Sequence, residues 1–110
     1  MATALKRNLS RGIGTAATAV GAYAVPAGRV STVVGLSLAN ITTGAISVSA
    51  AVWDGTNLTH IVKDAPVPAG STLVAIGSEQ KIMLQAADEV RVWSSVAASV
   101  DAIMSVAEVF

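Results

Sequence analysis

The single histidine, His60, is the first residue to consider for chemistry. A histidine could be the base of a Ser-His-Asp triad, but the sequence lacks the Gly-x-Ser-x-Gly turn that would present a nucleophilic serine. It also has no Gly-x-Gly-x-x-Gly or Walker motif for phosphates, and its acids lack the spacing of a calcium loop. Cysteine is absent, which excludes disulfides, thiol chemistry and cysteine-ligated zinc. We therefore expect no enzymatic activity, no catalytic residue, no metal site and no cofactor.

The two tryptophans, Trp53 and Trp93, are the next candidates. An exposed indole can stack on a sugar ring or a nucleobase, whereas a covered one fills a core or a subunit contact. Glycan-binding platforms usually gather several aromatic residues, and aromatics make up only 4% of this chain. We favour a core or interface role for both residues, with a ligand platform as the alternative.

Composition narrows the class of protein further. The chain has 110 residues, enough for one domain, and 53% of them are hydrophobic while 13% are charged, with a net charge of zero. Disordered chains need low hydrophobicity, and proteins that bind nucleic acid directly need a basic excess, so both classes are disfavoured. The segment from Val30 to Trp53 has no charged residue, but serine, threonine, asparagine and glycine alternate with its apolar residues. This alternation favours strands over a membrane span.

The elements that would position these residues follow a period of two. Ile46, Val48, Ala50 and Val52 alternate with smaller or polar neighbours, which indicates a strand with one face in a core. Asp54-Gly55 predicts a hairpin, while Ala65-Pro66 predicts the end of a strand because proline donates no ladder hydrogen bond. A helical turn over Gln85–Glu89 remains an alternative. The expected strands are Thr18–Tyr23, Arg29–Asn40, Ile46–Trp53, Leu58–Lys63, Ser71–Gly77, Lys81–Leu84, Glu89–Ser95 and Val100–Val109.

These strands and turns predict an all-β fold, a single antiparallel β-sandwich of about eight strands, jelly-roll-like, over residues 15–110. Val25-Pro26-Ala27-Gly28 recurs as Val67-Pro68-Ala69-Gly70. Two related Greek keys would produce such a repeat. Chance recurrence in a chain rich in alanine, glycine and valine is an equal alternative.

Residues 1–14 are predicted to form an extended basic N-terminal arm. Met1–Arg11 holds three basic residues and no acid, whereas the rest of the chain is mildly acidic. We expect this arm to dock on an acidic neighbour, as an added edge strand, through the residues Lys6, Arg7, Leu9 and Arg11. The alternative is a solvated, frayed terminus.

The surface chemistry predicts assembly. A mean hydropathy of +0.64 with few charged side chains would leave broad apolar patches on a monomer, and such patches usually mark interfaces. A net charge near zero also gives little repulsion between copies. We therefore expect a homo-oligomer or packing on a larger shell, with no membrane and no direct nucleic-acid partner.

The order of these turns and strands resembles small virion structural proteins of tailed bacteriophages, over roughly Tyr23 to Val109. The similarity is carried by Val25-Pro26-Ala27-Gly28, by Leu36-Ser37-Leu38-Ala39-Asn40, by the run from His60 to Gly70 and by the run from Lys81 to Val92. It departs at Ala87, where such proteins often place glycine before aspartate. A left-handed backbone at an alanine would cost about 1 kcal/mol.

The resemblance implies a capsid decoration or cement subunit that bridges neighbouring copies of a major capsid protein. A neck, collar or tail accessory protein is the alternative within the same class, and the location would be the virion, assembled in the host bacterial cytoplasm. A host-surface glycan-binding module that uses Trp53 or Trp93 is the alternative from another class.

Overall fold

A computed structural model of the chain describes residues 2–77 and 80–110, so that Met1, the first residue of the predicted arm, lies outside the described residues. The described residues form nine strands and one short 3-10 turn, η1. The elements are β1 (Thr3–Ile13), β2 (Thr18–Ala19), η1 (Val20–Ala22), β3 (Val30–Asn40), β4 (Ile46–Trp53), β5 (Leu58–Val67), β6 (Thr72–Ile76), β7 (Ile82–Leu84), β8 (Glu89–Ser94) and β9 (Val100–Val109).

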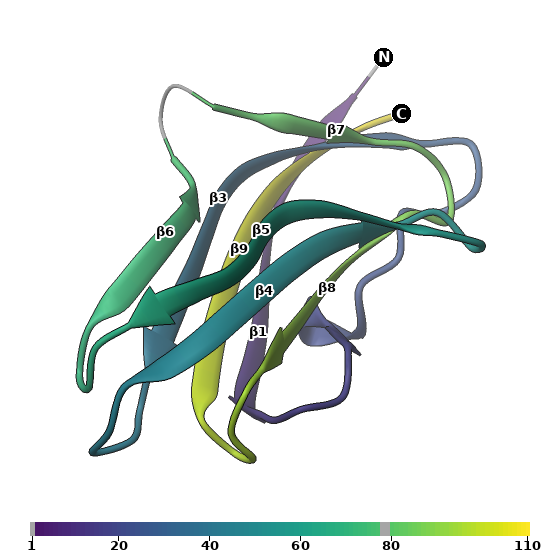
Figure 1. Cartoon of the computed structure of the whole chain (residues 1–110). Coiled ribbons are helices and arrows are strands. Elements are labelled where there is room, and N and C mark those ends of the chain that lie inside the picture. The colour runs from purple at the N-terminus through teal and green to yellow at the C-terminus, as the bar shows by residue number, and fades with distance from the viewer. Residues whose placement is uncertain (1, 78–79) are drawn as a thin grey trace.

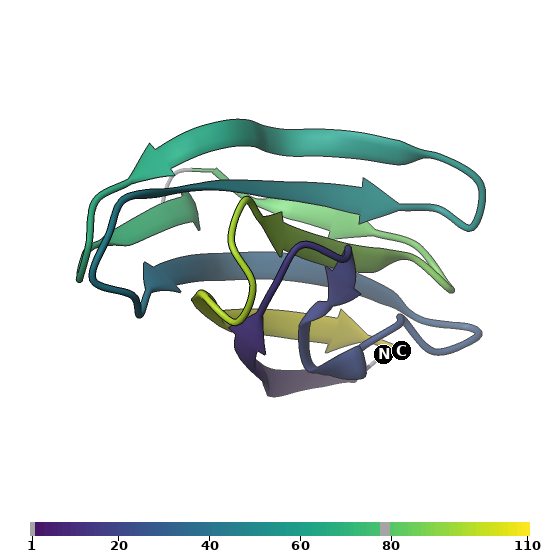
Figure 2. The same ribbon diagram turned by 60° about the horizontal axis from the view of Figure 1, so that its bottom comes forward.

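The strands build two antiparallel sheets that face each other (Figures 1 and 2). The five-stranded sheet has the order β1-β9-β3-β6, with β7 also paired to β3, and the four-stranded sheet has the order β2-β8-β4-β5. The predicted all-β antiparallel sandwich is confirmed. Strand β1 lies at one edge of the five-stranded sheet, and strand β5 lies at one edge of the four-stranded sheet.

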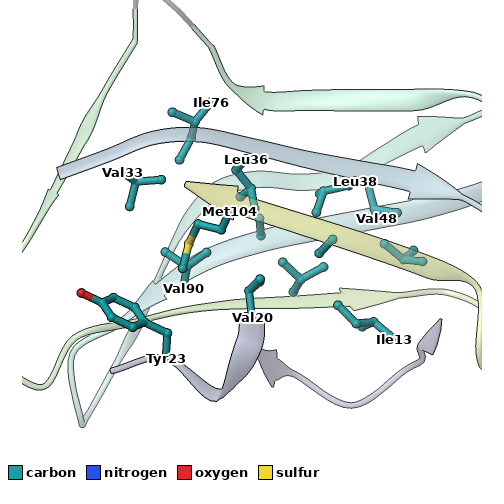
Figure 3. Close-up of a cluster of buried hydrophobic side chains, with 14 of the residues drawn as sticks. Ile13, Val20, Tyr23, Val33, Leu36, Leu38, Val48, Ile76, Val90 and Met104 are labelled. Carbon is teal, nitrogen blue, oxygen red and sulfur yellow. The ribbon is translucent and has the colours of Figure 1, made fainter. Parts of the chain in front are cut away.

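The core follows directly from the alternation of side chains along the strands. On β9, Val100, Ala102, Met104 and Val106 point inward, and the residues between them point outward. In the same sheet as β9, strand β3 contributes Leu36 and Leu38 to the core. From the facing sheet, strand β4 contributes Val48 and Ala50. Figure 3 shows this cluster, in which Val20 and Ile13 close the side of the sandwich near β1.

The predicted arm is part of the sandwich. Residues Thr3–Ile13 form β1, which pairs along its length with β9, and Ala2 and Phe110 exchange backbone hydrogen bonds beyond the end of the ladder. The strand that begins at Leu58 was expected to end at Lys63, before Pro66, but β5 continues to Val67. The prediction was wrong because β5 is an edge strand, where a proline nitrogen can face solvent without losing a ladder bond.

The segment Thr18–Tyr23 is also not one strand. Only Thr18 and Ala19 pair with β8, and the chain then turns through η1, where Gly21 has φ +64°. Over Gln85–Glu89 the chain makes a tight turn and no helix, with Ala87 at φ +72° and the Asp88 amide donating to the Gln85 carbonyl at 3.0 Å. The residue that departed from the virion-protein pattern therefore does adopt the left-handed conformation.

The predicted hairpin and the repeated tetrapeptide are both turns. Between β4 and β5 the Asp54 carboxylate accepts hydrogen bonds from the Thr56 and Asn57 amides, at 2.9 and 2.7 Å. In the repeats, the Arg29 amide donates to Pro26 and the Ser71 amide donates to Pro68. Gly28 and Gly70 have φ of +77° and +72°, as such a turn requires. Each repeat thus introduces a strand of the five-stranded sheet, β3 or β6.

Candidate functional site

The most polar site inside the sandwich is a cluster around Glu108, whose side chain is fully buried at the end of β9. The Tyr23 hydroxyl donates to Glu108 Oε2 at 2.6 Å, while Arg29 Nη1 and Lys6 Nζ lie 2.9 and 3.2 Å from Oε1. The Ser31 hydroxyl lies 2.6 Å from the Tyr23 oxygen. Because both carboxylate oxygens have donors, the cluster joins β1, β3, β9 and the segment after η1 into one connected unit.

The charges of the cluster shift the protonation of its members. The hydrogen bond from Tyr23, followed by those from Arg29 and Lys6, lowers the pKa of Glu108 against the effect of burial. Burial and the hydrogen bond to Glu108 raise the pKa of Tyr23 to about 12. At neutral pH Glu108 is therefore ionised and Tyr23 is protonated. The pairing holds the ends of β1 and β9 together.

Glu108 is not among the residues predicted from the sequence to form a site. The signal was available, since Glu108 continues the inward series of Val100, Ala102, Met104 and Val106 on β9. An acid at an inward position demands cationic or hydroxyl partners. What the sequence lacked was the identity of those partners, which come from three other segments far away along the chain.

The structure brings His60 and both tryptophans to the outer face of the four-stranded sheet. Ala51 on β4 pairs with His60 on one side and with Arg91 on the other. The His60 ring meets the Trp93 ring edge-on, with 5.5 Å between ring centroids. Arg91 lies 4.5 Å over the Trp53 ring and forms a 2.9 Å ion pair with Glu89. Outside the core, Trp53 and Trp93 are thus half-buried and His60 is exposed. His60 contacts Trp93, and Trp53 contacts Arg91.

All three candidate rings contact a neighbouring side chain in this arrangement. The cation of Arg91 covers a face of the Trp53 ring, a stabilising contact that a stacked ligand would have to displace. In the described part of the chain there is no pocket and no group of three or more metal-ligating side chains. Within that same part, no helix is long and apolar enough to cross a bilayer.

The four predicted arm residues separate into three positions on β1. Lys6 turns toward Glu108, as described above. Arg7 and Leu9 lie on the outer face of the five-stranded sheet, opposite Ser105 and Ile103 of β9. Arg11 is exposed in the bulge between Ser10 and Ile13. The structure therefore does not gather them into one docking site.

The outer face of the five-stranded sheet is the largest feature that the core does not explain. We call it the apolar face and define it by six exposed side chains: Leu5, Leu9, Val30, Val74, Met83 and Ile103. Leu5 is 82% exposed, Met83 70%, Val74 61% and Ile103 51%, although such residues normally lie inside proteins. Apolar surface of this kind usually marks an interaction site.

The register arranges the apolar face in two rows that cross the sheet. One row runs Leu9–Ile103–Ser37–Val74 across β1, β9, β3 and β6. The other runs Leu5–Ala107–Thr32–Met83 across β1, β9, β3 and β7. Between them lies a central row of Arg7, Ser105 and Gly35.

The two long free edges are poorer contact surfaces than this face. Edge strand β5 carries Pro66 and an irregular register around Asp64, which has φ +50°. Edge strand β1 carries three basic residues and its own bulge. Proline, bulges and charges are the features by which proteins prevent further strands from pairing at an edge. The unprotected surface is therefore the apolar face.

Comparison with known proteins bears on the fold of the chain. No family model and no curated protein matches the chain. Among solved structures, it is similar to a chain from Bacillus endospore appendages, described as "a novel family of disulfide-linked pili". The TM-score is 0.55 at 14% sequence identity, and the alignment covers 96% of this chain and 86% of that one. At this identity the match supports the sandwich fold.

This match corrects the predicted function. The chain was expected to be a capsid decoration or cement protein, or a neck or tail accessory protein, of a phage particle. The fold that it matches instead belongs to a bacterial appendage, so this prediction is wrong. The glycan-binding alternative at Trp53 or Trp93 is corrected with it. The resemblance to virion proteins in sequence is not tested by any match.

Proposed function

We propose that the chain is a non-enzymatic structural subunit that assembles with other protein subunits, foremost further copies of itself. The observation that carries this proposal is the apolar face, whose leucine, valine, methionine and isoleucine side chains are exposed across all strands of one sheet. Covering that face removes apolar area from water, which drives most protein association. The pilus subunit with the same fold supports a role of this kind.

Contacts between copies would be noncovalent. The appendages with the similar fold are described as disulfide-linked, whereas this chain has no cysteine. Its affinity must therefore come from buried apolar area and close packing, and it should depend on protein concentration.

The test is the mass of the protein in solution. Sedimentation velocity and light scattering across the micromolar range should show dimers or larger species whose share rises with concentration, and electron microscopy should show their shape. The variant His60→Ala is the matched control, because His60 lies on the opposite sheet, and its assembly should be unchanged. A purified protein that stays monomeric at every concentration would contradict assembly with further copies of itself.

A further inference from the structure

We infer that the apolar face pairs with the same face of a second copy about a two-fold axis that crosses the strands at Ser105. This inference rests on the proposed function and adds to it the surface, the partner and the symmetry of one contact. It follows from the arrangement of the rows, from the size of the face and from the properties of the other surfaces.

The symmetry follows from the two rows. The central row that contains Ser105 lies midway between the row of Ile103 and the row of Ala107. A two-fold axis along the central row places each apolar row opposite the other row of the second copy. The large Ile103 side chain then faces the small Ala107, Leu5 faces Leu9, and Met83 faces Val74. Large side chains thus meet small ones at the centre, which is the self-complementarity that a two-fold interface requires.

The central row itself permits close approach. Ser105 and Gly35 are small, and an added Cβ at Gly35 would have its nearest neighbour only at 4.0 Å, so this line of the sheet presents little bulk. Arg7 is the charged member of the row, and it lies on the edge strand β1. In the paired form the two Arg7 guanidinium groups reach solvent at the same edge, where they repel each other weakly. Charge therefore opposes this contact slightly, and apolar burial must drive it.

The area is sufficient for a specific contact. From Asp101 to Val109 strand β9 is about 27 Å long, at ~3.4 Å per residue. Four neighbouring strands at a spacing of ~4.8 Å give a width of about 19 Å. Pairing two such faces covers roughly 1,000 Å² in total, which is the level that a biological interface should reach.

A two-fold pairing also explains why the partner is the same face and not the opposite sheet. The outer face of the four-stranded sheet carries the Glu89–Arg91 ion pair and the Arg91–Trp53 contact, so these charged side chains already have partners. If the apolar face of one copy packed on the four-stranded sheet of the next copy, the last copy of every such stack would still expose its apolar face. Pairing like faces covers both at once. It is the arrangement of two copies that leaves neither apolar face in water.

Cysteine cross-linking tests the axis, because the chain has no cysteine of its own. Ser105→Cys places a thiol beside its counterpart at the axis, and disulfides between facing sheets are known in immunoglobulin domains. Under mild oxidation this variant should form a covalent dimer. Ser71→Cys is the matched control: Ser71 is exposed in the turn before β6, away from the axis, and this variant should stay uncross-linked.

A second pair of variants tests the face without cross-linking. Ile103→Asp should raise the dissociation constant at least about tenfold, since pairing would bury two carboxylates without partners. Val96→Asp is the control, because Val96 is 42% exposed and lies in the loop between β8 and β9. Arg7→Gln should tighten the association, and added salt should do the same. Circular dichroism confirms that each variant is folded.

The outcomes separate the two proposals. A wild-type protein that remains monomeric overturns both the proposed function and this pairing. A protein that associates while Ser105→Cys fails to cross-link, or while Ile103→Asp associates as tightly as Val96→Asp, overturns the two-fold pairing alone and leaves assembly through another surface. Cross-linking at Ser105 together with loss of association in Ile103→Asp supports the inference.

Discussion

Tyr23 and Glu108, 85 positions apart in the sequence, are joined by a 2.6 Å hydrogen bond inside the sandwich. Because Tyr23 donates its proton to the carboxylate, the Ser31 hydroxyl must donate to the Tyr23 oxygen, 2.6 Å away. The chain thus satisfies a fully buried carboxylate with one neutral donor and two cations. This connection fixes the segment before β3 against the last residues of β9.

Removing the hydroxyl should therefore destabilise the fold. Tyr23→Phe keeps the ring in the core but takes one donor from an ionised, buried acceptor, which typically costs about 1–3 kcal/mol of the free energy of unfolding. Urea denaturation measures this loss. Ser31→Ala is the control, because it removes a bond between neutral groups and should cost less. Equal stabilities of Tyr23→Phe and the unchanged chain would show that the bond does not contribute.

The same cluster predicts how stability depends on pH. The folded pKa of Glu108 lies below its ordinary value of 4.5, so its contribution is complete above that pH and is lost as the pH falls toward the folded pKa. The folded pKa of Tyr23 is raised from 10.0 to about 12, so its contribution is complete below pH 10.0 and is lost as the pH rises through about 12. Stability should be flat between these limits and fall on both sides.

Variants assign the two limbs of this profile. The measurement is the denaturation midpoint across the pH range. In Tyr23→Phe, which has no phenol to ionise, the midpoint should fall less at alkaline pH than in the unchanged chain. In Glu108→Gln the midpoint should fall less at acid pH than in the unchanged chain. That variant starts from lower stability, because Lys6 and Arg29 lose their anion. An alkaline decline of the same size in Tyr23→Phe would show that other groups cause it.

The fold was predictable where alternation and turns act locally. Val100–Val109 and Ile46–Trp53 alternate so regularly that their bounds match the strands β9 and β4. The end of β5 was not predictable in this way, since a proline ends a central strand but is accepted in an edge strand. Whether a strand lies at an edge is decided by the order of the sheet, which local patterns do not contain.

The candidate site was less predictable than the fold. Composition indicated an assembling protein, but it could not say which side chains share a face, because Leu9, Ile103 and Val74 meet only through the register of strands distant in sequence. The charged arm residues were misread for the same reason. Lys6 and Arg7 are neighbours in sequence, yet they point to opposite faces of β1, one toward Glu108 and one toward solvent.

Ala87 offers a stabilising substitution. It has φ +72°, a left-handed conformation that costs an L residue about 1–2 kcal/mol and glycine almost nothing. The greater freedom of glycine in the unfolded chain offsets part of this gain. Ala87→Gly should therefore raise the free energy of unfolding by about 0.5–1 kcal/mol.

The neighbouring alanine provides the control for this prediction. Ala86 is also exposed in the same turn but is not among the residues with positive φ, so Ala86→Gly should lower stability or leave it unchanged. Thermal unfolding of both variants measures the difference. A loss of stability in Ala87→Gly as large as that in Ala86→Gly would contradict a strained turn.

Gly12 and Gly21 separate backbone strain from steric crowding, because both have φ +64° but only one is crowded. A Cβ at Gly12 would meet nothing within 4 Å, so Gly12→Ala should cost only the left-handed strain, which the lower freedom of alanine in the unfolded chain offsets in part, and the net loss should be about 0.5–1 kcal/mol. A Cβ at Gly21 would lie 2.8 Å from the Cβ of Asn8 and 3.2 Å from the Leu9 nitrogen, so Gly21→Ala must also push η1 away from β1. Gly21→Ala should therefore lower the free energy of unfolding more than Gly12→Ala, and it should weaken the hydrogen bond from the Gly21 amide to the Ser10 hydroxyl, now 2.8 Å long.

Hydrogen exchange provides the decisive measurement. The β1 amides should exchange faster in Gly21→Ala than in Gly12→Ala, beyond what the difference in global stability explains. Equal exchange in the two variants would mean that β1 and η1 do not depend on this close approach.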